Sequence, residues 1–503
     1  MALAIVYSRA NIGIEAPLVT VEVHLSNGLP GFNIVGLPET AVKESKERVR
    51  SAILNSQLEF PQRRITINLA PADLPKAGGR FDLAIAVGIL AASRQIDRAS
   101  LKNRVFMGEL ALSGAIRKVN GILPGLIACH REQRGCIVPC DNAAEAAVLA
   151  QMDIVMCGHL LDLLPYLKGE TTLPVPPVPV MPEWDYNIDF QDVVGQESAK
   201  RALLIAAAGG HNLLMRGPPG TGKTMLASRL VTILPPLTED QAMEVAAIQS
   251  IAKTEFALHS WRKPPFRTPH HTSSAVALVG GGSTLNPGEI SLAHHGVLFL
   301  DELPEFSPRV LEVMREPMEA GHIQIARARY QVRLPASFQL LAAMNPCPCG
   351  YYGDSERACR CTQEKVKQYQ QRISGPMFDR IDMQVEVARL SEDDKTQLLQ
   401  KRAGKTANSK ELRQRVVECR ELQMERSGLI NARLEQNEVQ QFCNLSDVDS
   451  ALLNEAMSRL RLSTRAYFRI LKIARTIADL SQVENILRPH LLEAINYRRF
   501  DIF

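Results

Sequence analysis

A glycine-rich loop near the middle of the chain constrains the fold more than any other feature. It fits the pattern G-x-x-x-x-G-K-S/T and comprises Gly217, Pro218, Pro219, Gly220, Thr221, Gly222, Lys223 and Thr224. Glycines at these positions let backbone N–H groups face the α- and β-phosphates of a nucleotide, while the lysine reaches the β- and γ-phosphates and the threonine hydroxyl binds Mg²⁺. Residues 212–215 predict a buried strand before the loop and residues 225–230 a helix after it, which places the helix N-terminus at the phosphates. The chain is therefore expected to bind a nucleoside triphosphate.

The composition predicts a multidomain protein that does not enter a membrane. The chain has 503 residues, of which 46% are hydrophobic and 22% charged, and this length is too great for a single core. The N-terminus lacks the apolar run of a signal peptide, and no later run reaches the length of a membrane span. We expect a cytoplasmic protein, in which the ten cysteines are reduced thiols or metal ligands rather than disulfides.

Shifts in composition divide the chain into four parts. Residues 1–167 combine strand-like alternation, as at 20–24 and 64–69, with a helix predicted over 39–55, and indicate an α/β domain. Residues 168–184 carry five prolines, which favour an extended connector. Beyond the connector we expect an ATPase core over residues 185–391 and a helical lid domain over residues 392–503.

Polar side chains follow two further strands that are predicted in the core. The apolar run 296–300 leads directly to Asp301 and Glu302, and the run 339–344 leads to Asn345. An open α/β sheet places its chemistry at these carboxyl ends. Asp301 is expected to hold Mg²⁺, Glu302 to orient or deprotonate the attacking water, and Asn345 to position that water against the γ-phosphate.

This order of phosphate loop, Asp-Glu strand, Asn-tipped strand and helical lid resembles the AAA+ ATPases. The resemblance implies ATP as the nucleotide, with Val194 and Gly195 lying against the adenine. It implies that Arg380 is an arginine finger supplied to a neighbouring subunit, with Arg372 as the rival for that role. Arg465 matches the sensor-two position of the lid, where Arg469 or Arg475 is a candidate to assist it. A finger supplied in trans implies a ring, which in this family has six subunits.

Two insertions resemble those of the clade that holds magnesium chelatases and minichromosome maintenance helicases. More residues separate Lys223 from Asp301 than one helix and one strand require, and the excess includes residues 269–274 and 280–283. Gly280, Gly281 and Gly282 predict a mobile loop that follows a polymer through a pore, although an ordinary long turn is the alternative. The adjacent pair His270 and His271 suggests a metal ligand, but neighbouring side chains usually diverge, so a structural role is favoured.

The second insertion is a predicted hairpin over residues 323–334. Apolar alternation flanks a tip that carries Arg327 and Arg329, just before the strand that ends in Asn345. Arginines at such a tip would contact the phosphates of a threaded DNA strand without reading its sequence. A solvated hairpin with no partner is the alternative.

Four cysteines form two close pairs, C-x-C and C-x-C, separated by a short loop. They are Cys347, Cys349, Cys359 and Cys361. Four thiolates with this spacing are able to close a tetrahedral Zn²⁺ site that staples the loop after Asn345. Buried or redox-active thiols are the alternative.

The front domain resembles the proteolytic domain of Lon. The matching stretches are residues 74–83 and 108–114. Lon proteases need a serine nucleophile and a lysine that activates it. In this chain Arg80 occupies the serine position, and the lysine position falls near Pro124. We therefore expect a non-proteolytic Lon/S5-like domain, a scaffold or DNA-binding collar with Lys76 and Arg80 as candidate basic contacts.

Over essentially its full length the chain resembles the ComM (YifB) family of magnesium-chelatase-like competence proteins. The fold class implied is multidomain α/β: a Lon/S5-like front domain, an AAA+ core with a helix-2 insertion and a pre-sensor hairpin, and a helical lid. The function implied is a hexameric ATP-dependent DNA helicase that migrates branches while single-stranded DNA is integrated by homologous recombination during natural transformation. Single-stranded and branched DNA, further copies of the chain and recombination proteins are the expected partners. The alternative is a motor like magnesium chelatase, which remodels a protein partner for metal insertion and needs no DNA.

Overall fold

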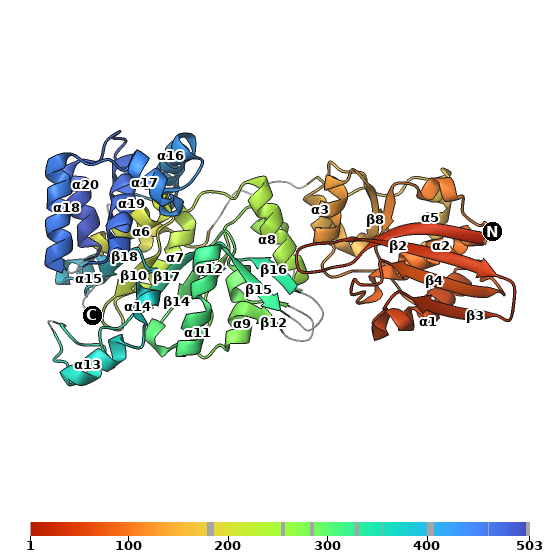
Figure 1. Ribbon diagram of the computed structural model, residues 1–503, viewed down its shortest axis with the longest axis horizontal. Coiled ribbons are helices and arrows are strands. Elements are labelled where there is room, and N and C mark those ends of the chain that lie inside the picture. Colours follow the sequence, from red (N-terminus) through yellow and green to blue (C-terminus); the bar gives the residue numbers. More distant parts are fainter. Residues whose placement is uncertain are drawn as a thin grey trace. The chain divides into compact units, whose positions relative to one another are not determined.

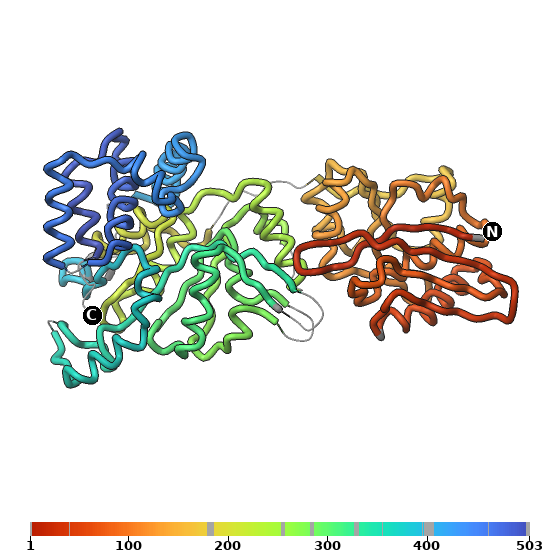
Figure 2. Tube along the Cα trace, viewed as in Figure 1, coloured from red at the N-terminus to blue at the C-terminus, as the bar shows by residue number. Residues whose placement is uncertain are grey.

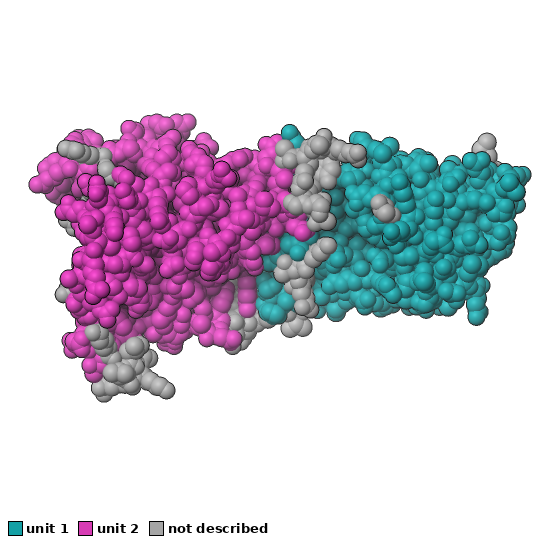
Figure 3. All heavy atoms as spheres, turned by 90° about the horizontal axis from the view of Figure 1, so that it is seen from below, with its two compact units in different colours: residues 1–183, 239–262, 326–332 teal, residues 184–238, 263–325, 333–503 magenta. Residues whose placement is uncertain are grey.

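The computed structural model describes residues 2–178, 186–252, 257–281, 286–326, 331–354, 356–399, 407–460 and 462–498. The chain forms two compact units (Figure 3). Unit 1 comprises Met1–Glu183, Glu239–Arg262 and Ala326–Val332, and unit 2 comprises Trp184–Thr238, Lys263–Ile325 and Arg333–Phe503. Across the described residues, no helix combines the length and the apolar character that crossing a membrane requires.

Unit 1 is built on a seven-stranded mixed sheet (Figure 1). The strands lie in the order β3-β4-β2-β1-β5-β8-β9, and their bounds are β1 Ala2–Arg9, β2 Leu18–Ser26, β3 Gly31–Val35, β4 Arg64–Ala70, β5 Arg104–Phe106, β8 Gly135–Pro139 and β9 Ile154–Cys157. β2 pairs antiparallel with β1 and β4, whereas the remaining neighbours are parallel. Val19, Val21 and Val23 are fully buried, because alternate side chains of β2 face the core.

Helices α2, α3 and α5 of unit 1 pack on this sheet. The helices of the unit are α1 Thr40–Asn55, α2 Asp82–Ala92, α3 Leu123–Arg131, α4 Ala143–Ala147, α5 Leu160–Leu167 and α8 Glu239–Ile251, and a small hairpin joins β6 Glu109–Leu110 to β7 Ile116–Arg117. The strands and the helix that the sequence predicts within residues 20–69 are confirmed. Although α8 follows the phosphate loop in the sequence, it packs against α3, and Ser250 on α8 donates a hydrogen bond of 2.6 Å to Glu145 on α4.

Two basic residues of unit 1 that were expected at the surface lie inside it. Lys76 is fully buried, and its Nζ donates to the carbonyl of Pro71. Arg80 donates to Asn11 Oδ1 at 2.5 Å and to the carbonyl of Asn120 at 2.7 Å. Burial lowers the pKa of both groups, that of Arg80 to about 10. The prediction that Lys76 and Arg80 contact DNA is therefore wrong, because their charged groups are enclosed by the domain.

Unit 2 is built on a five-stranded sheet in which every pair of neighbours is parallel. The order is β11-β14-β17-β10-β18, and the bounds are β10 Leu213–Arg216, β11 Phe266–Arg267, β14 Val297–Leu300, β17 Gln339–Met344 and β18 Met383–Glu386. Leu213 and Leu214 belong to different buried clusters, as do Phe299 and Leu300, so both faces of the sheet are covered. This burial explains the continuous apolar runs and confirms the strands predicted at 212–215, 296–300 and 339–344.

Helices pack on both faces of this sheet. α6 Glu197–Gly209 and α7 Lys223–Ile233 contribute to one buried cluster, while α11 Pro308–Val313, α12 Arg315–Ala320 and α14 Gly375–Phe378 contribute to or adjoin the other. The remaining core helices are α9 Ala275–Val279, α10 Glu289–Leu292 and α13 Gln363–Gln370. Parallel strands place all their carboxyl ends at one edge of the sheet, so Asp301, Asn345 and the phosphate loop meet there.

Both predicted insertions are present in the structure. β12 Gly280–Gly281 pairs with β13 Asn286–Pro287, and β15 His322–Ala326 pairs with β16 Gln331–Pro335, which confirms the predicted hairpin. Gly282, Arg327 and Arg329 lie outside the described residues.

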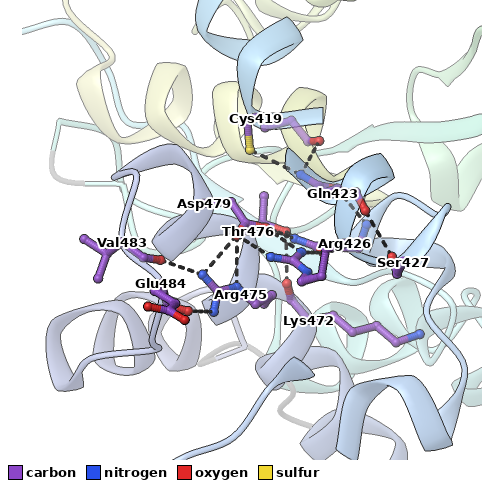
Figure 4. A network of polar contacts seen from close by, with 12 residues as sticks. Cys419, Gln423, Arg426, Ser427, Lys472, Arg475, Thr476, Asp479, Val483 and Glu484 are labelled. Carbon is purple, nitrogen blue, oxygen red and sulfur yellow. Dashed lines mark hydrogen bonds and ion pairs between the residues drawn. The ribbon is translucent and has the colours of Figure 1, made fainter. Parts of the chain in front are cut away.

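The C-terminal part of unit 2 is helical, as predicted (Figure 2). Its helices are α15 Glu392–Leu399, α16 Ser409–Ser427, α17 Gln436–Phe442, α18 Asp447–Leu460, α19 Thr464–Leu480 and α20 Arg488–Asn496. Ile470, Ala474 and Ile477 of α19 lie in the same buried cluster as α6 and α7, so lid and sheet share one core. The prediction that Arg475 assists at the nucleotide is wrong, because this side chain is buried in the lid and donates to Asp479, Val483 and Glu484 (Figure 4).

Candidate functional site

The phosphate loop connects the end of β10 to the start of α7, as its sequence pattern predicts. Gly220 and Gly222 adopt φ angles of 79° and 85°, in the left-handed region that favours glycine. A Cβ on Gly217 would lie 2.2 Å from the backbone oxygen of Val387, so a larger residue there would push the loop away from the strand. These glycines permit the tight turn by which the backbone passes from β10 into the N-terminus of α7.

Lys223 lies inside the loop that precedes it. Its Nζ donates to the carbonyls of Gly217 and Pro218, each at 2.8 Å, and to Asn345 Oδ1 at 3.2 Å. Only 8% of Lys223 is exposed, and burial lowers the pKa of its ammonium. The ammonium therefore connects the phosphate loop to the end of β17. Its positive charge is held in place there and could bind a phosphate group of a nucleotide.

Thr224 and Asp301 meet across the sheet edge. The hydroxyl of Thr224 donates a hydrogen bond of 2.7 Å to Asp301 Oδ2. One hydroxyl and one carboxylate at this separation fit Mg²⁺, which prefers oxygen ligands and fills its remaining positions with water and substrate phosphates. Both groups retain access to solvent.

Glu302 has an unusual backbone conformation. Its φ angle is 53°, in a region that non-glycine residues rarely adopt and that recurs at functional sites. Its N–H donates to Asp301 Oδ1 at 2.9 Å. The side chain is half exposed, and its Oε2 lies 3.6 Å from Nδ1 of His271. Glu302 therefore stands at the same edge as Asp301, with a histidine of the first insertion beside it.

The residues expected against the adenine lie next to Gln196, which contacts the phosphate loop. Val194 is largely buried, and a Cβ on Gly195 would lie 2.8 Å from the carboxylate of Asp394. The next residue, Gln196, donates to the carbonyls of Ala388 at 2.6 Å and Thr221 at 3.5 Å. A cavity of about 290 Å³ adjoins this region, and its lining includes Gly217, Pro218, Tyr352, Ala388 and Ser391.

Arg380 lies at the opposite edge of the sheet from the phosphate loop. Its carbonyl accepts a hydrogen bond of 2.9 Å from Asn212, the residue before β10, whereas the loop begins after β10. Five residues of strand between Asn212 and Gly217 span about 16 Å. Arg380 is 8% exposed, and its guanidinium donates to the carbonyl of Pro376 and to Glu319. Arg380 therefore faces away from the nucleotide site of its own subunit.

Arg465 lies on the same side of unit 2 as Arg380. Its Nη1 is 3.7 Å from Oδ2 of Asp379, and the side chain is 67% exposed. Four residues along α19, Arg469 donates to the carbonyl of Ile381 at 3.0 Å. The rival for the finger role, Arg372, is half exposed and pairs with Glu305 at 2.9 Å. The first turns of α19 thus support the segment that carries Arg380, rather than the phosphate loop of the same chain.

The four cysteines come together in unit 2. Their sulfur atoms lie within 4.8 Å of one another, and the separations from Cys347 are 3.4 Å to Cys349 and 3.7 Å to Cys359. Four thiolates bound to one Zn²⁺ at about 2.3 Å would lie about 3.8 Å apart. The donor set and its spacing therefore fit tetrahedral zinc.

The loop between the cysteine pairs touches the phosphate loop. Gly350 has a φ angle of 85°, and a Cβ there would lie 2.6 Å from Cδ of Pro219. Arg389 holds the far end of this segment through ion pairs of 2.8 Å to Asp354 and 3.1 Å to Glu356. The cysteine cluster is therefore positioned to support the nucleotide site, although it holds none of the reacting groups.

Two residues of this region escaped the sequence reasoning. Asp379 pairs with Arg465; its position directly before Arg380 in the sequence was a signal that could have identified it. His271 contacts Glu302. The sequence shows the His270-His271 pair, but no sequence pattern shows which distant side chain an insertion contacts.

Three magnesium-chelatase family models match the chain. "Magnesium chelatase, subunit ChlI" matches residues 189–395, "Subunit ChlI of Mg-chelatase" matches residues 21–142, and "Magnesium chelatase, subunit ChlI C-terminal" matches residues 406–498. The chain is 50% identical to competence protein ComM of Haemophilus influenzae over 99% of this chain and 98% of that protein. It is 48% identical to the protein YifB of Escherichia coli over 100% of this chain and 98% of that protein. A weaker similarity, 26% identity over 38% of this chain and 56% of that protein, relates it to the magnesium-chelatase 38 kDa subunit of Rhodobacter capsulatus.

Proposed function

The chain belongs to the ComM (YifB) family of magnesium-chelatase-like AAA+ proteins, and we propose that it is a hexameric, ATP-dependent DNA helicase. In this proposal it drives branch migration while single-stranded DNA is integrated by homologous recombination during natural transformation. The observation that carries the motor is the meeting of Lys223, Thr224, Asp301 and Asn345 at one edge of a parallel sheet. The similarity to competence protein ComM of Haemophilus influenzae supports the role in competence.

The reaction at this site is transfer of the γ-phosphoryl group of ATP to water. Lys223 and Asn345 would contact the γ-phosphate, while Glu302 would orient the attacking water and accept its proton. Thr224 and Asp301 would hold Mg²⁺, which would supply positive charge to offset that of the phosphates. The backbone of Gly217 to Gly222 would cradle the remaining phosphates, and Val194 and Gly195 would lie against the base.

Completion of the site requires a second copy of the chain. The backbone of Arg380 contacts Asn212, which β10 separates from the phosphate loop by about 16 Å of strand, and Arg465 contacts the adjacent Asp379. We assign both arginines to the nucleotide of a neighbouring subunit, where they would stabilise the charge that develops on the γ-phosphate. Arg380 would first have to leave Glu319, its partner in the isolated chain. Identical interfaces of this head-to-tail kind close into a ring when the rotation between subunits closes, and we propose that it does so with six subunits.

DNA as the track is supported by the two insertions. In the sequence, Arg327 and Arg329 come directly after β15, and Gly280, Gly281 and Gly282 belong to the glycine-rich stretch. Contacts of arginine to phosphate supply affinity without sequence preference, as a translocating motor needs. We propose that these elements contact the strand as ATP is hydrolysed.

The other parts of the chain would support this motor. We propose a front domain over residues 1–167, a connector over 168–184, a core over 185–391 and a lid over 392–503. The front domain is proposed to be a Lon-like scaffold without protease activity, because Arg80 occupies the serine position and is buried. Cys347, Cys349, Cys359 and Cys361 are proposed to hold a structural Zn²⁺ beside the phosphate loop.

A second candidate function is a motor that remodels a protein partner for metal insertion. The matches to magnesium-chelatase models across the chain favour it. The two functions share the nucleotide site and differ in the track, so the effect of DNA on hydrolysis separates them.

The test is the ATPase rate of the purified protein with and without single-stranded and forked DNA. The helicase proposal expects DNA to stimulate hydrolysis, with a stronger effect at low salt because phosphate contacts are screened by salt. Lys223→Ala is the control and should abolish hydrolysis under every condition. A rate that no DNA changes, in wild-type protein that hydrolyses ATP, would favour the metal-insertion motor instead.

A further inference from the structure

Unit 2 contains a cavity of about 500 Å³ on the face of its sheet that α6 and α7 do not cover. Leu213 and Met215 of β10 pack with these two helices, whereas Leu214 packs in the cluster on the other face. Side chains alternate along a strand, so Arg216 faces the same side as Leu214, and both line the cavity. The sheet therefore lies between this cavity and the two helices.

The cavity is enclosed by strand ends, by α13 and by the loop between the cysteine pairs. Met344 ends β17, Gln384 lies on β18, and Tyr352 lies in the loop. Four residues of α13 face the cavity with the spacing of one helix surface, namely Gln363, Val366, Lys367 and Gln370. Gln370 donates a hydrogen bond of 3.1 Å to the carbonyl of Pro346, so α13 is tied to the end of β17. The cavity is therefore preformed, as sites for small molecules usually are.

The lining is positively charged, and none of its described residues is acidic. Arg216 and Lys367 are its two cations, and amide groups come from the glutamines at positions 363, 370, 371 and 384. The other described side chains are apolar or aromatic. A cavity of this size with an apolar lining and a few polar groups is typical of sites for small organic molecules. The charge of the lining selects a molecule that carries an anionic group.

Arg216 is the cation of the lining that lacks a partner. Across the described residues, its guanidinium forms no hydrogen bond and no ion pair, although the side chain is only partly exposed. Glu386, which lies opposite Arg216 in the pairing of β10 with β18, is exposed and is not in ion-pair contact with it. Burial lowers the pKa of Arg216, because its charge has lost contact with water. A bound anion would supply the charged partner that these residues do not.

Aromatic and amide groups of the cavity are suited to a ring as well as an anion. Tyr352 is 44% exposed, so its ring is available to stack on a bound ring. The loop that carries Tyr352 is held by the ion pair of 2.8 Å between Asp354 and Arg389. Glutamine amides both donate and accept hydrogen bonds, as the edges of heterocyclic bases require. Together these groups fit a planar heteroaromatic ring that is joined to one phosphate or carboxylate.

We propose that this cavity is a second ligand site of the chain, which binds a small heteroaromatic anion such as a nucleoside monophosphate. The anionic group pairs with Arg216 and is approached by the exposed Lys367, while the ring stacks on Tyr352. Arg216 and Tyr352 also line the cavity of about 290 Å³ beside the phosphate loop, so the two sites share a wall. The site requires neither hydrolysis nor DNA, and the inference therefore goes beyond the proposed function.

The test measures binding while the nucleotide site is occupied. Full-length protein is saturated with Mg²⁺ and a non-hydrolysable ATP analogue, and is then titrated by isothermal calorimetry with AMP, UMP, nicotinate or inorganic phosphate. AMP and UMP carry a phosphate, nicotinate carries a carboxylate, and inorganic phosphate has no ring. The probes therefore separate the two kinds of anion and show whether a ring is needed.

Four variants test the residues of the site. Arg216→Gln removes the guanidinium charge, Arg216→Lys keeps a cation, and Tyr352→Ala removes the ring. Lys365→Gln is the matched control, because Lys365 is an exposed cation of α13 that is not among the described lining residues. Affinity for the ATP analogue, measured first, and thermal unfolding curves establish that each variant folds and keeps its phosphate loop.

In wild type, at least one probe with a ring should bind at one additional site per chain. Arg216→Gln should raise the Kd of that probe by about 10- to 100-fold, the range of a hydrogen bond to a charged group. Tyr352→Ala should raise it by about 5-fold or more through lost stacking. Arg216→Lys should raise the Kd less than Arg216→Gln does, and Lys365→Gln should leave it within about twofold of wild type.

Three results would overturn the proposal: no additional binding of any probe with a ring, inorganic phosphate binding as tightly as those probes, or an unchanged Kd in Arg216→Gln. If Arg216→Gln loses its affinity for the ATP analogue, Tyr352→Ala decides, because its exposed side chain lies outside the sheet. An unchanged Kd in that variant would also contradict the site. Protein without motor activity is tested in the same way, so a failure of the proposed function is distinguishable from a failure of this site.

Discussion

Replacement of Asp479 should loosen the lid, because this carboxylate compensates two arginines (Figure 4). Asp479 is 4% exposed and accepts hydrogen bonds from Arg426 at 2.7 and 2.9 Å, from Arg475 at 3.0 Å and from Asn431 at 2.8 Å. Arg475 is 3% exposed, so its charge cannot turn to solvent without local unfolding. Removing one partner of a buried ion pair costs about 3–5 kcal/mol. We therefore expect Asp479→Ala to destabilise α19 by this amount, and Asp479→Asn by less because it keeps one acceptor oxygen.

Hydrogen exchange of the α19 backbone amides measures this loss directly. A destabilisation of about 3–5 kcal/mol lowers the protection of these amides by about 10²- to 5 × 10³-fold in Asp479→Ala. The matched control is Asp447→Asn, which changes an exposed carboxylate in the first turn of α18 and should shift protection by less than about threefold. A decrease of less than about tenfold in Asp479→Ala would refute the reasoning, because it would mean that the arginines find other partners.

Further predictions concern the interface, the cysteines and pH. Subunits carrying Lys223→Ala and Arg380→Ala should each be inactive alone, yet an equal mixture should regain about one quarter of the wild-type ATPase sites if the finger acts in trans; no recovery would place it in cis. Cys359→Ser should reduce bound zinc from one per chain to well below one by metal analysis and weaken ATP binding, whereas a wild-type protein without zinc would contradict the assignment. Burial lowers the pKa of His211 to about 4, whereas a histidine in the unfolded state has a pKa of about 6.5. Between these two pH values the unfolded state binds a proton at His211 and the folded state does not. Stability is therefore full above about pH 6.5 and should fall by up to about 3 kcal/mol as the pH drops toward 4, as measured by urea unfolding of wild type and of His211→Asn, which should lack this component.

The parts of the site that the sequence predicted are those encoded by short patterns next to strands. A parallel strand that is buried on both faces must be apolar throughout, so the polar residues at its end stand out. This is why Asp301 and Asn345 could be placed at one sheet edge with the phosphate loop. The spacing of the four cysteines likewise predicted that their sulfur atoms would lie together, as they do.

The parts that could not be predicted depend on which way a charged side chain faces. Lys76 and Arg80 were candidate basic contacts, but the front domain encloses both and supplies carbonyl or amide acceptors. Arg475 was a candidate to assist at the nucleotide; the spacing of four residues to Asp479 allowed an ion pair, but it did not reveal that the pair is buried. The contact of His271 with Glu302 joins an insertion to a strand end, and no local pattern encodes it.

Unwinding of a forked DNA with a fluorescent label on one strand tests the central claim most directly. The account predicts ATP-dependent release of the labelled strand by wild-type protein and no release by Lys223→Ala at equal concentration. ATP hydrolysis by the wild-type protein without any release of the strand, at low salt and with DNA bound, would contradict it.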